Sequence, residues 1–251
     1  MSDRFAICYH AVSETWPAVL SITSRQLDRQ LEYLSRRGYA GLPAAEALSS
    51  TARTPVVALT FDDAYRSVLT RAKPILDRYG MRASVYVPTD WIGRGEPMTW
   101  PGIEQWLGGP HEPELACMGW DELRELAGAG WEIGSHTRSH PRLAEIDDEA
   151  KLADELEGSR QVLEDGMGGP CVSIAYPYGS HDERVVAAAE RAGYELGLTL
   201  PFAFPRPRPL AWPRLGIYHP DAEWRWRLKI SRPVRALRRT PVWGALAGLR
   251  G

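Results

Sequence analysis

Two adjacent aspartates, Asp62 and Asp63, follow directly after the apolar run from Val56 to Phe61. One interpretation is a solvated turn that caps the helix after it. The other is a site at the carboxyl end of a buried parallel strand, where α/β folds place their chemistry. The chain turns at such an end, so one carboxylate could bind a metal ion while its neighbour accepts a proton from water. A ligand and a base are then within reach of one water molecule.

Two histidines four residues apart, His136 and His140, follow a second strand-like stretch at residues 131–135. A single helical turn or a tight loop would bring both imidazoles to one side, and Pro141 keeps a helix from continuing far. This spacing alone is more often coincidental than metal-binding. Combined with a carboxylate from another strand end, two neutral imidazoles form a ligand set that suits zinc or a similar divalent ion.

The segment Pro177-Tyr178-Gly179 ends a third apolar run, at residues 172–176. Proline and glycine bracket a rigid turn, and a backbone N–H there could point at an oxyanion that develops during a reaction. Most sequences of this kind are only turns. The segment therefore gains meaning only from the two motifs before it.

Strand-like and helical patterns alternate along most of the chain, which predicts a parallel sheet covered by helices. Seven or so such units suggest a barrel. The expected strands are residues 4–9, 55–61, 83–87, 131–135, 171–176, 194–199 and 214–218. The expected helices lie between residues 24 and 38, and at residues 68–79, 120–129, 147–164 and 182–192, with Pro74 kinking or breaking the second.

Residues 89–118 interrupt this alternation and predict a long inserted loop rich in tryptophan, glycine and proline. Loops of this length are usually functional or disordered. Aromatic faces stack on sugar rings, but the tryptophans could equally form a small apolar plug under the loop. We take Trp100 in this loop, and Pro177 in the turn described above, as candidates for contact with a substrate.

Three segments together resemble the polysaccharide deacetylase family, also called the NodB-homology domain or carbohydrate esterase family four: "TFDDA" at 60–64, "SHTRSHP" at 135–141 and "AYPYG" at 175–179. The opening "ICYHAV" is also similar to the first strand of many members, and the resemblance runs from about residue 5 to 218. It implies a distorted (β/α)7 barrel and metal-dependent hydrolysis of N-acetyl groups on amino sugars. It further implies Asp63, His136 and His140 as ligands of a divalent metal, most commonly Zn²⁺. Asp62 would be the general base, and the N–H of Tyr178 would hold the oxyanion.

The sequence departs from the family's pattern at three points. Ala64 stands where the first motif usually ends in glycine, and Ala175 or its apolar neighbours stand where many members have an arginine that orients the base. The histidine that acts as general acid is not evident. His10, at the end of the first expected strand, is our first candidate, and His219, just past the last strand, is the second.

Composition indicates an ordinary globular protein, with 44% hydrophobic and 25% charged residues and a net charge of −2. This charge argues against a nucleic-acid binder. Three cysteines far apart argue against a disulfide framework. The start of the chain has no leader pattern and no apolar run is long enough to span a membrane, so we expect a cytoplasmic enzyme.

The chain divides in this interpretation into a catalytic domain, residues 1–223, and a basic tail with several tryptophans, residues 224–251. The tail is either a solvated extension or a segment that lies on an anionic membrane at the inner face. An amino sugar, an N-acetylated polysaccharide or a glycolipid intermediate is the expected substrate. The alternatives are hydrolysis of another non-peptide C–N bond on the same scaffold, or a catalytically weak carbohydrate-binding protein.

Overall fold

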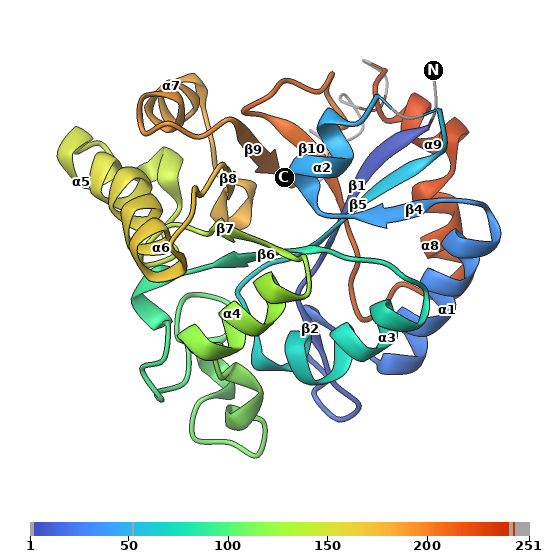
Figure 1. Ribbon diagram of the computed structural model, residues 1–251, viewed down its shortest axis with the longest axis horizontal. Coiled ribbons are helices and arrows are strands. Elements are labelled where there is room, and N and C mark those ends of the chain that lie inside the picture. The colour runs from blue at the N-terminus through green and yellow to red at the C-terminus, as the bar shows by residue number, and fades with distance from the viewer. Residues whose placement is uncertain (1–2, 52, 241–242, 244–251) are drawn as a thin grey trace.

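Seven parallel strands close into a barrel in the computed structural model, which describes residues 3–51, 53–240 and 243 (Figure 1). The ring follows the order β1, β10, β9, β8, β7, β6 and β5, and pairing of β1 with β5 closes it. The expected barrel and all seven expected strands are therefore confirmed. The barrel strands are β1 (Arg4–Tyr9), β5 (Val56–Phe61), β6 (Ser84–Val87), β7 (Glu132–Ser135), β8 (Ser173–Ala175), β9 (Leu196–Thr199) and β10 (Trp212–Gly216).

Three short strands were not expected from the sequence: β2 (Ala11–Val12), β3 (Ser21–Ile22) and β4 (Ala40–Leu42). β2 and β3 pair with each other in a separate two-stranded sheet. β4 pairs with the first half of β5, and β6 pairs with the second half. Since β1 runs along all of β5 on one edge, β4 and β6 share the other edge, and β4 lies outside the ring.

Alternate residues of each strand face opposite sides, which separates the barrel interior from the layer of helices. Large apolar side chains of β1 and β5, such as Ile7 and Leu59, belong to the main core beneath the helices. A second, smaller cluster contains Ala6, Ala58 and Ala175. Small side chains at these interior positions leave room inside the barrel for larger polar groups.

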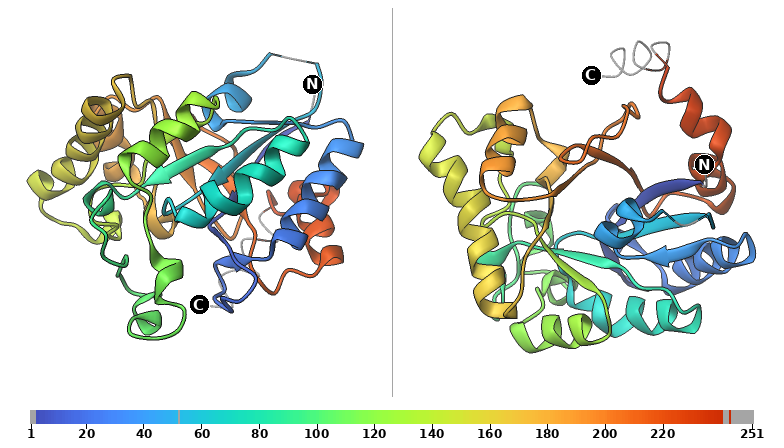
Figure 2. Two further views of the ribbon diagram at one scale, coloured as in Figure 1. Left: turned by 60° about the horizontal axis from the view of Figure 1, so that its bottom comes forward. Right: turned by 45° about the horizontal axis from the view of Figure 1, so that its top comes forward.

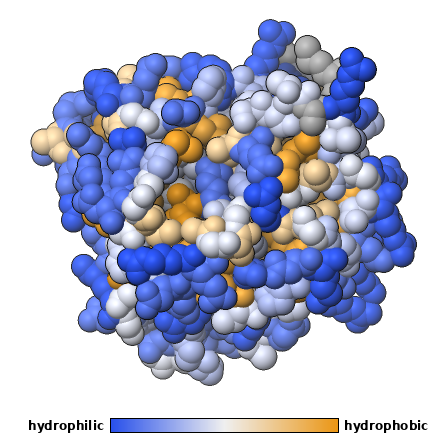
Figure 3. All heavy atoms as spheres, in the orientation of Figure 1, coloured by the Kyte–Doolittle hydropathy of each residue, from blue (hydrophilic) through white to orange (hydrophobic). Residues whose placement is uncertain are grey.

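Helices surround the barrel and cover its outer face (Figure 1), and on the face drawn in Figure 3 hydrophilic residues occupy most of the periphery. They are α1 (Ser24–Arg36), α2 (Ala44–Ser49), α3 (Lys73–Arg78), α4 (Trp120–Gly128), α5 (Glu149–Ala153), α6 (Ser159–Met167), α7 (Glu183–Arg191), α8 (Glu223–Ile230) and α9 (Arg232–Leu237). A π-helical segment, Val68–Ala72, precedes α3, and Pro74 lies in the first turn of α3. Proline lacks an N–H, so the expected disturbance of this helix is present. A second π-helical segment, Asp154–Gly158, joins α5 to α6.

The long segment at residues 89–118 is an ordered loop with three short 3₁₀ turns. Its tryptophans pack edge to face against other rings: Trp106 against Trp16 at 6.0 Å between centroids, and Trp91 against Trp100 at 6.0 Å. Much of this aromatic content thus forms the apolar plug that the sequence allowed.

The first part of the basic tail packs on the barrel as α8 and α9, beside α1 (Figure 2). Trp226 is completely buried and meets the Tyr33 ring at 5.3 Å, while buried Arg235 pairs with Asp3 at 2.5 Å. Residues 241–242 and 244–251 of that tail lie outside the described residues. In the part of the chain that the structure describes, no helix has the length and apolar character that crossing a bilayer requires.

Candidate active site

A pocket of about 450 Å³ opens at the carboxyl ends of the barrel strands, where β/α barrels hold their catalytic groups. The three motifs and the first strand all contribute to its wall. The candidate residues that line it are His10, Asp62, Asp63, Trp100, His136, His140 and Tyr178. Pro177 is buried beneath the turn, and its neighbours Tyr178 and Gly179 line the pocket in its place.

Asp63, His136 and His140 converge on one point. The Oδ1 atom of Asp63 lies 3.4 Å from Nε2 of His136 and 3.3 Å from Nε2 of His140, and all three side chains are buried. Nδ1 of His136 lies 2.7 Å from the carbonyl oxygen of Ala175, so it donates its hydrogen there and leaves Nε2 free to bind a cation. Oδ1 of Asp63 has no hydrogen-bond partner among the described residues. An unpaired buried carboxylate oxygen between two imidazole nitrogens fits a divalent metal ion.

The charges of this cluster shift the pKa values of its members. Burial by itself raises the pKa of Asp63, but the imidazoles of His136 and His140 beside it hold that pKa well below its usual range. Burial lowers the pKa of His140. Burial acts in the same direction on His136, but the neighbouring carboxylates of Asp62 and Asp63 outweigh it and raise the pKa of that ring.

The backbone is left-handed at each of the three motifs. Five residues other than glycine have positive φ among those the structure describes: Asp63 (68°), Ala64 (49°), Thr137 (66°), His140 (64°) and Tyr178 (57°). Residues other than glycine enter this region at a cost, and such strain gathers at functional sites. It also accounts for the glycine that usually ends the first motif, because position 64 has the conformation that glycine adopts most easily and that Ala64 adopts here at a cost.

The loop between the two histidines is held by Glu155 from the π-helical segment. Its buried carboxylate accepts hydrogen bonds from the backbone N–H groups of Arg138 at 2.8 Å and Ser139 at 3.0 Å. The hydroxyl of Ser139 donates to the same carboxylate. The N–H of His140 donates to Thr137 Oγ1 at 3.2 Å. The "SHTRSH" segment is thus a tight loop and not a helical turn, and Glu155 fixes its shape.

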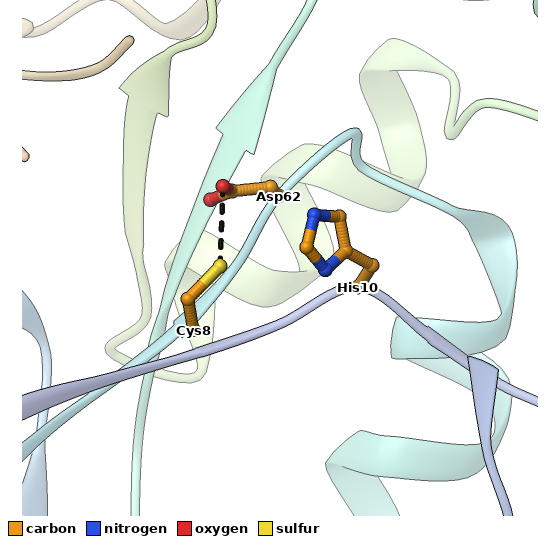
Figure 4. Close-up of side chains that lie close together, drawn as sticks. All are labelled: Cys8, His10 and Asp62. Carbon is orange, nitrogen blue, oxygen red and sulfur yellow. Dashed lines mark hydrogen bonds between the residues drawn. The ribbon is translucent and has the colours of Figure 1, made fainter. Parts of the chain in front are cut away.

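Asp62 forms a bidentate pair with Arg214 of β10 rather than an ion pair with either histidine. The distances are 2.6 Å from Nη1 to Oδ1 and 2.7 Å from Nη2 to Oδ2, and Arg214 is completely buried. Burial by itself raises the pKa of Asp62, but the guanidinium beside it lowers that pKa to about 2. The thiol of Cys8 also donates to Oδ2 at 3.3 Å, and the ring of His10 lies beside this pair (Figure 4). The two adjacent aspartates therefore have different partners.

Among the four histidines other than His136 and His140, His10 lines the pocket and the others do not. Its ring stacks near Tyr218 with 6.4 Å between centroids, and its Nδ1 is buried with no partner among the described residues. His219, our second candidate, points Nδ1 at the carbonyl oxygen of Ser21 at 3.2 Å. His181 binds the carbonyl oxygen of Gly179, and His111 packs against Trp106. Burial lowers the pKa of His10.

Trp100 and Tyr178 both contact the ligand candidate His140. The Trp100 ring stacks on His140 with 4.1 Å between centroids, and the Tyr178 ring meets it edge to face at 4.8 Å. The hydroxyl of Tyr178 donates to the carbonyl oxygen of Pro101 at 2.9 Å, which ties the long loop to the turn after β8. Arg142 covers the Tyr178 ring at 4.1 Å and also lines the pocket. One face of Trp100 thus supports His140.

The chain is similar to known proteins over much of its length. A family model described as polysaccharide deacetylase matches residues 49–197. The chain belongs to the polysaccharide deacetylase family. Among relatives, YxkH of Bacillus subtilis (strain 168), which carries the name polysaccharide deacetylase, is 25% identical over 198 residues, covering 77% of this chain and 63% of that protein. The poly-beta-1,6-N-acetyl-D-glucosamine N-deacetylase of Staphylococcus aureus (strain MRSA252) is 23% identical over 192 residues, covering 72% of this chain and 61% of that protein. The chain thus spans about three fifths of the length of these relatives.

Solved structures of similar fold include IcaB from Ammonifex degensii, with a TM-score of 0.73, 21% identity and coverage of 96% of this chain and 98% of that one. The Streptococcus pyogenes deacetylase PplD, solved in complex with acetate, has a TM-score of 0.72, 22% identity and coverage of 91% and 98%. Because these identities are low, the similarity applies to the fold alone. That fold is the barrel expected from the sequence.

Sequence reasoning missed two residues that shape the site of this family member. We looked for an arginine beside the P-x-G turn and found Ala175 there, whereas Arg214 reaches Asp62 from two strands further on. The signal was present, because Arg214 is a charged residue at the start of an expected apolar strand. Glu155 lies in the middle of the expected helix at residues 147–164. Acidic residues are common in such helices, so no sequence pattern indicated its role.

Proposed function

We propose that this protein is a metal-dependent deacetylase that hydrolyses the N-acetyl group of an amino sugar. The observation that carries the proposal is the division between the adjacent aspartates. Asp63 Oδ1 lies within 3.4 Å of both histidine Nε2 atoms, while Arg214 holds both oxygens of Asp62. A ligand set and a separately held carboxylate at one pocket are what hydrolysis by an activated water requires.

Asp63, His136 and His140 would hold the divalent ion, and nitrogen and oxygen donors in this number favour Zn²⁺. Such an ion supplies positive charge that makes water more acidic and the substrate carbonyl more reactive. Asp62 would accept the proton of the attacking water, with Arg214 fixing its orientation. The backbone N–H of Tyr178 would donate to the oxygen of the attacked carbonyl as its charge develops.

His10 is the candidate for the group that gives a proton to the departing amine. It is the histidine in the pocket wall that the ligand set does not use. Burial lowers its pKa, which makes the protonated ring a stronger acid. Collapse of the tetrahedral intermediate breaks the C–N bond, and the nitrogen takes the proton as acetate forms.

Acetate release from a panel of N-acetylated amino sugars tests this function. We expect activity that a chelator abolishes and added Zn²⁺ restores. His136→Ala and His140→Ala should bind less metal and lose turnover, whereas His181→Ala, outside the pocket, should keep both. No acetate release from any sugar with Zn²⁺ bound would reject the proposal, and full metal content in both ligand variants would reject the ligand assignment.

A further inference from the structure

An apolar groove of about 600 Å³ adjoins the catalytic pocket, a size usual for sites that bind small molecules. It lies between the segment after β9, the end of β10 and helices α8 and α9. Leu200 and Tyr218 line both the groove and the catalytic pocket. The two hollows therefore share a wall at the carboxyl end of the barrel, and a ligand could occupy both.

The groove gathers apolar side chains that the fold leaves in contact with water. Trp224 is 66% exposed, Leu228 is 52% exposed and Phe202 is 49% exposed, and all three line the groove. They are three of the seven large hydrophobic side chains that are exposed in the described part of the chain. Apolar groups that cluster beside a catalytic pocket are typical of a surface that binds an apolar partner.

Positive charge borders the same groove. The side chains of Arg225 and Arg238 have no carboxylate partner among the residues that the structure describes, although Arg238 donates to the carbonyl oxygens of Pro201 and Phe202. Lys229, by contrast, pairs with Asp221 at 2.5 Å. Two cations free of carboxylates beside an apolar lining match an amphiphile that carries an anionic group near its hydrocarbon chain.

We propose that this groove receives the hydrocarbon chain of a lipid-linked amino sugar whose N-acetylated ring lies in the catalytic pocket. The inference rests on the proposed function and names its substrate class. The wall shared by the two hollows lets the sugar ring and the hydrocarbon chain of one ligand occupy both. The exposed side chains supply the apolar surface, and Arg225 and Arg238 suit an anionic link such as a phosphate.

The test compares octyl and methyl glycosides of N-acetylglucosamine, both below the concentration at which the octyl compound forms micelles. Burial of only two methylenes of the octyl chain should already give the octyl glycoside about tenfold tighter binding by calorimetry and a similar gain in kcat/KM. Octyl phosphate should displace it better than octanol does, because of the two arginines. Equal displacement by both would overturn the anionic link.

Two matched variants locate the effect. Leu228→Ser, in the groove, should bring the octyl-to-methyl ratio of affinities close to one. Leu237→Ser is the control, because Leu237 is 48% exposed on α9 and does not line the groove. It should keep the ratio of the parent protein. Equal affinities for the two glycosides in the parent, or equal loss of the ratio in both variants, would overturn the inference.

Sedimentation with vesicles of phosphatidylcholine and phosphatidylglycerol separates a lipid substrate from a membrane surface. Binding to vesicles that depends on Leu228, without any preference for the octyl glycoside, would show that the groove meets a bilayer and overturn the proposal. Failure of the catalytic proposal has a different result: tighter binding of the octyl glycoside with no acetate released from any sugar.

Discussion

Arg214 and Asp62 lie 152 positions apart in the sequence and form a bidentate ion pair inside the barrel. The strand register explains how they meet. Ala6 of β1 pairs with both Arg214 of β10 and Ala58 of β5, and Asp62 follows four residues after Ala58. The small side chains of the two alanines leave the space through which the arginine extends toward the catalytic rim.

Removal of this arginine should both destabilise the protein and change its pH profile. Arg214→Met leaves a buried carboxylate unpaired, which typically costs about 3–5 kcal/mol in the free energy of unfolding. The pKa of Asp62 should rise, since Arg214 holds it low, so the acidic limb of kcat/KM should move to higher pH. Denaturant unfolding and rate profiles measure the two effects.

An exposed ion pair between Arg208 and Glu183 provides the matched control for this substitution. Arg208 also bonds both oxygens of a carboxylate, that of Glu183, but in contact with water. Arg208→Met should cost no more than about 1 kcal/mol. Arg214→Lys keeps a charge without the bidentate geometry and should be intermediate. Equal costs at positions 208 and 214 would contradict the role assigned to burial.

The Asp62 carboxylate should contribute stability that acid removes. Its pKa is about 2 in the folded protein and near 3.9 in an unfolded chain, so the contribution is complete above pH 3.9 and is lost as the pH falls toward 2. The shift corresponds to about 2–3 kcal/mol. The free energy of unfolding is measured for the parent protein and for Asp62→Asn, both freed of metal by a chelator. We expect the difference between the two values to shrink as the pH falls through this range. A difference that stays constant with pH would refute the shift.

The adjacent aspartates should give different phenotypes when each is replaced by asparagine. Asp63→Asn removes a ligand and should lose metal. Asp62→Asn should keep the metal but lose on the order of 10²-fold or more in rate, as the loss of a general base does. Metal analysis and acetate release distinguish the two. If the two variants had the same metal content and the same rate, the assignment of Asp63 as ligand and Asp62 as base would be wrong.

His10→Ala should bind metal but turn over slowly, mainly through a lower kcat. A proton donor is active only below its pKa, so the rate of the parent falls as the pH rises through that value. Because burial lowers the pKa of His10, we expect this fall to begin below the ordinary value of 6.5 in the free protein, and to vanish in the variant. A variant with the parent's kcat and high-pH limb would make His10 structural.

Glu155→Gln should weaken metal binding without touching a ligand. The amide has one oxygen in place of two, so it cannot accept all the hydrogen bonds that Arg138 and Ser139 donate. A looser loop between His136 and His140 should lower metal affinity on the order of tenfold. The exposed Glu157→Gln on the same π-helical segment is the control. Equal metal affinities in both variants would remove Glu155 from the site.

The sequence by itself determined the barrel strands and the positions of three motifs at their carboxyl ends. These are local properties: an apolar run of strand length, a break by glycine or proline, and a polar residue where the run ends. The placement of His10, Asp62 and His136 at one rim then follows from the parallel arrangement alone.

Only the tertiary structure decided which partners these side chains have. The pairing of Arg214 with Asp62 depends on barrel closure through β1, and the support of the histidine loop by Glu155 depends on how the π-helical segment packs. The groove beside Tyr218 likewise arises where α8 and α9 meet the segment after β9. Such contacts join residues far apart in the chain, and their energies come from burial and geometry that no local sequence pattern records.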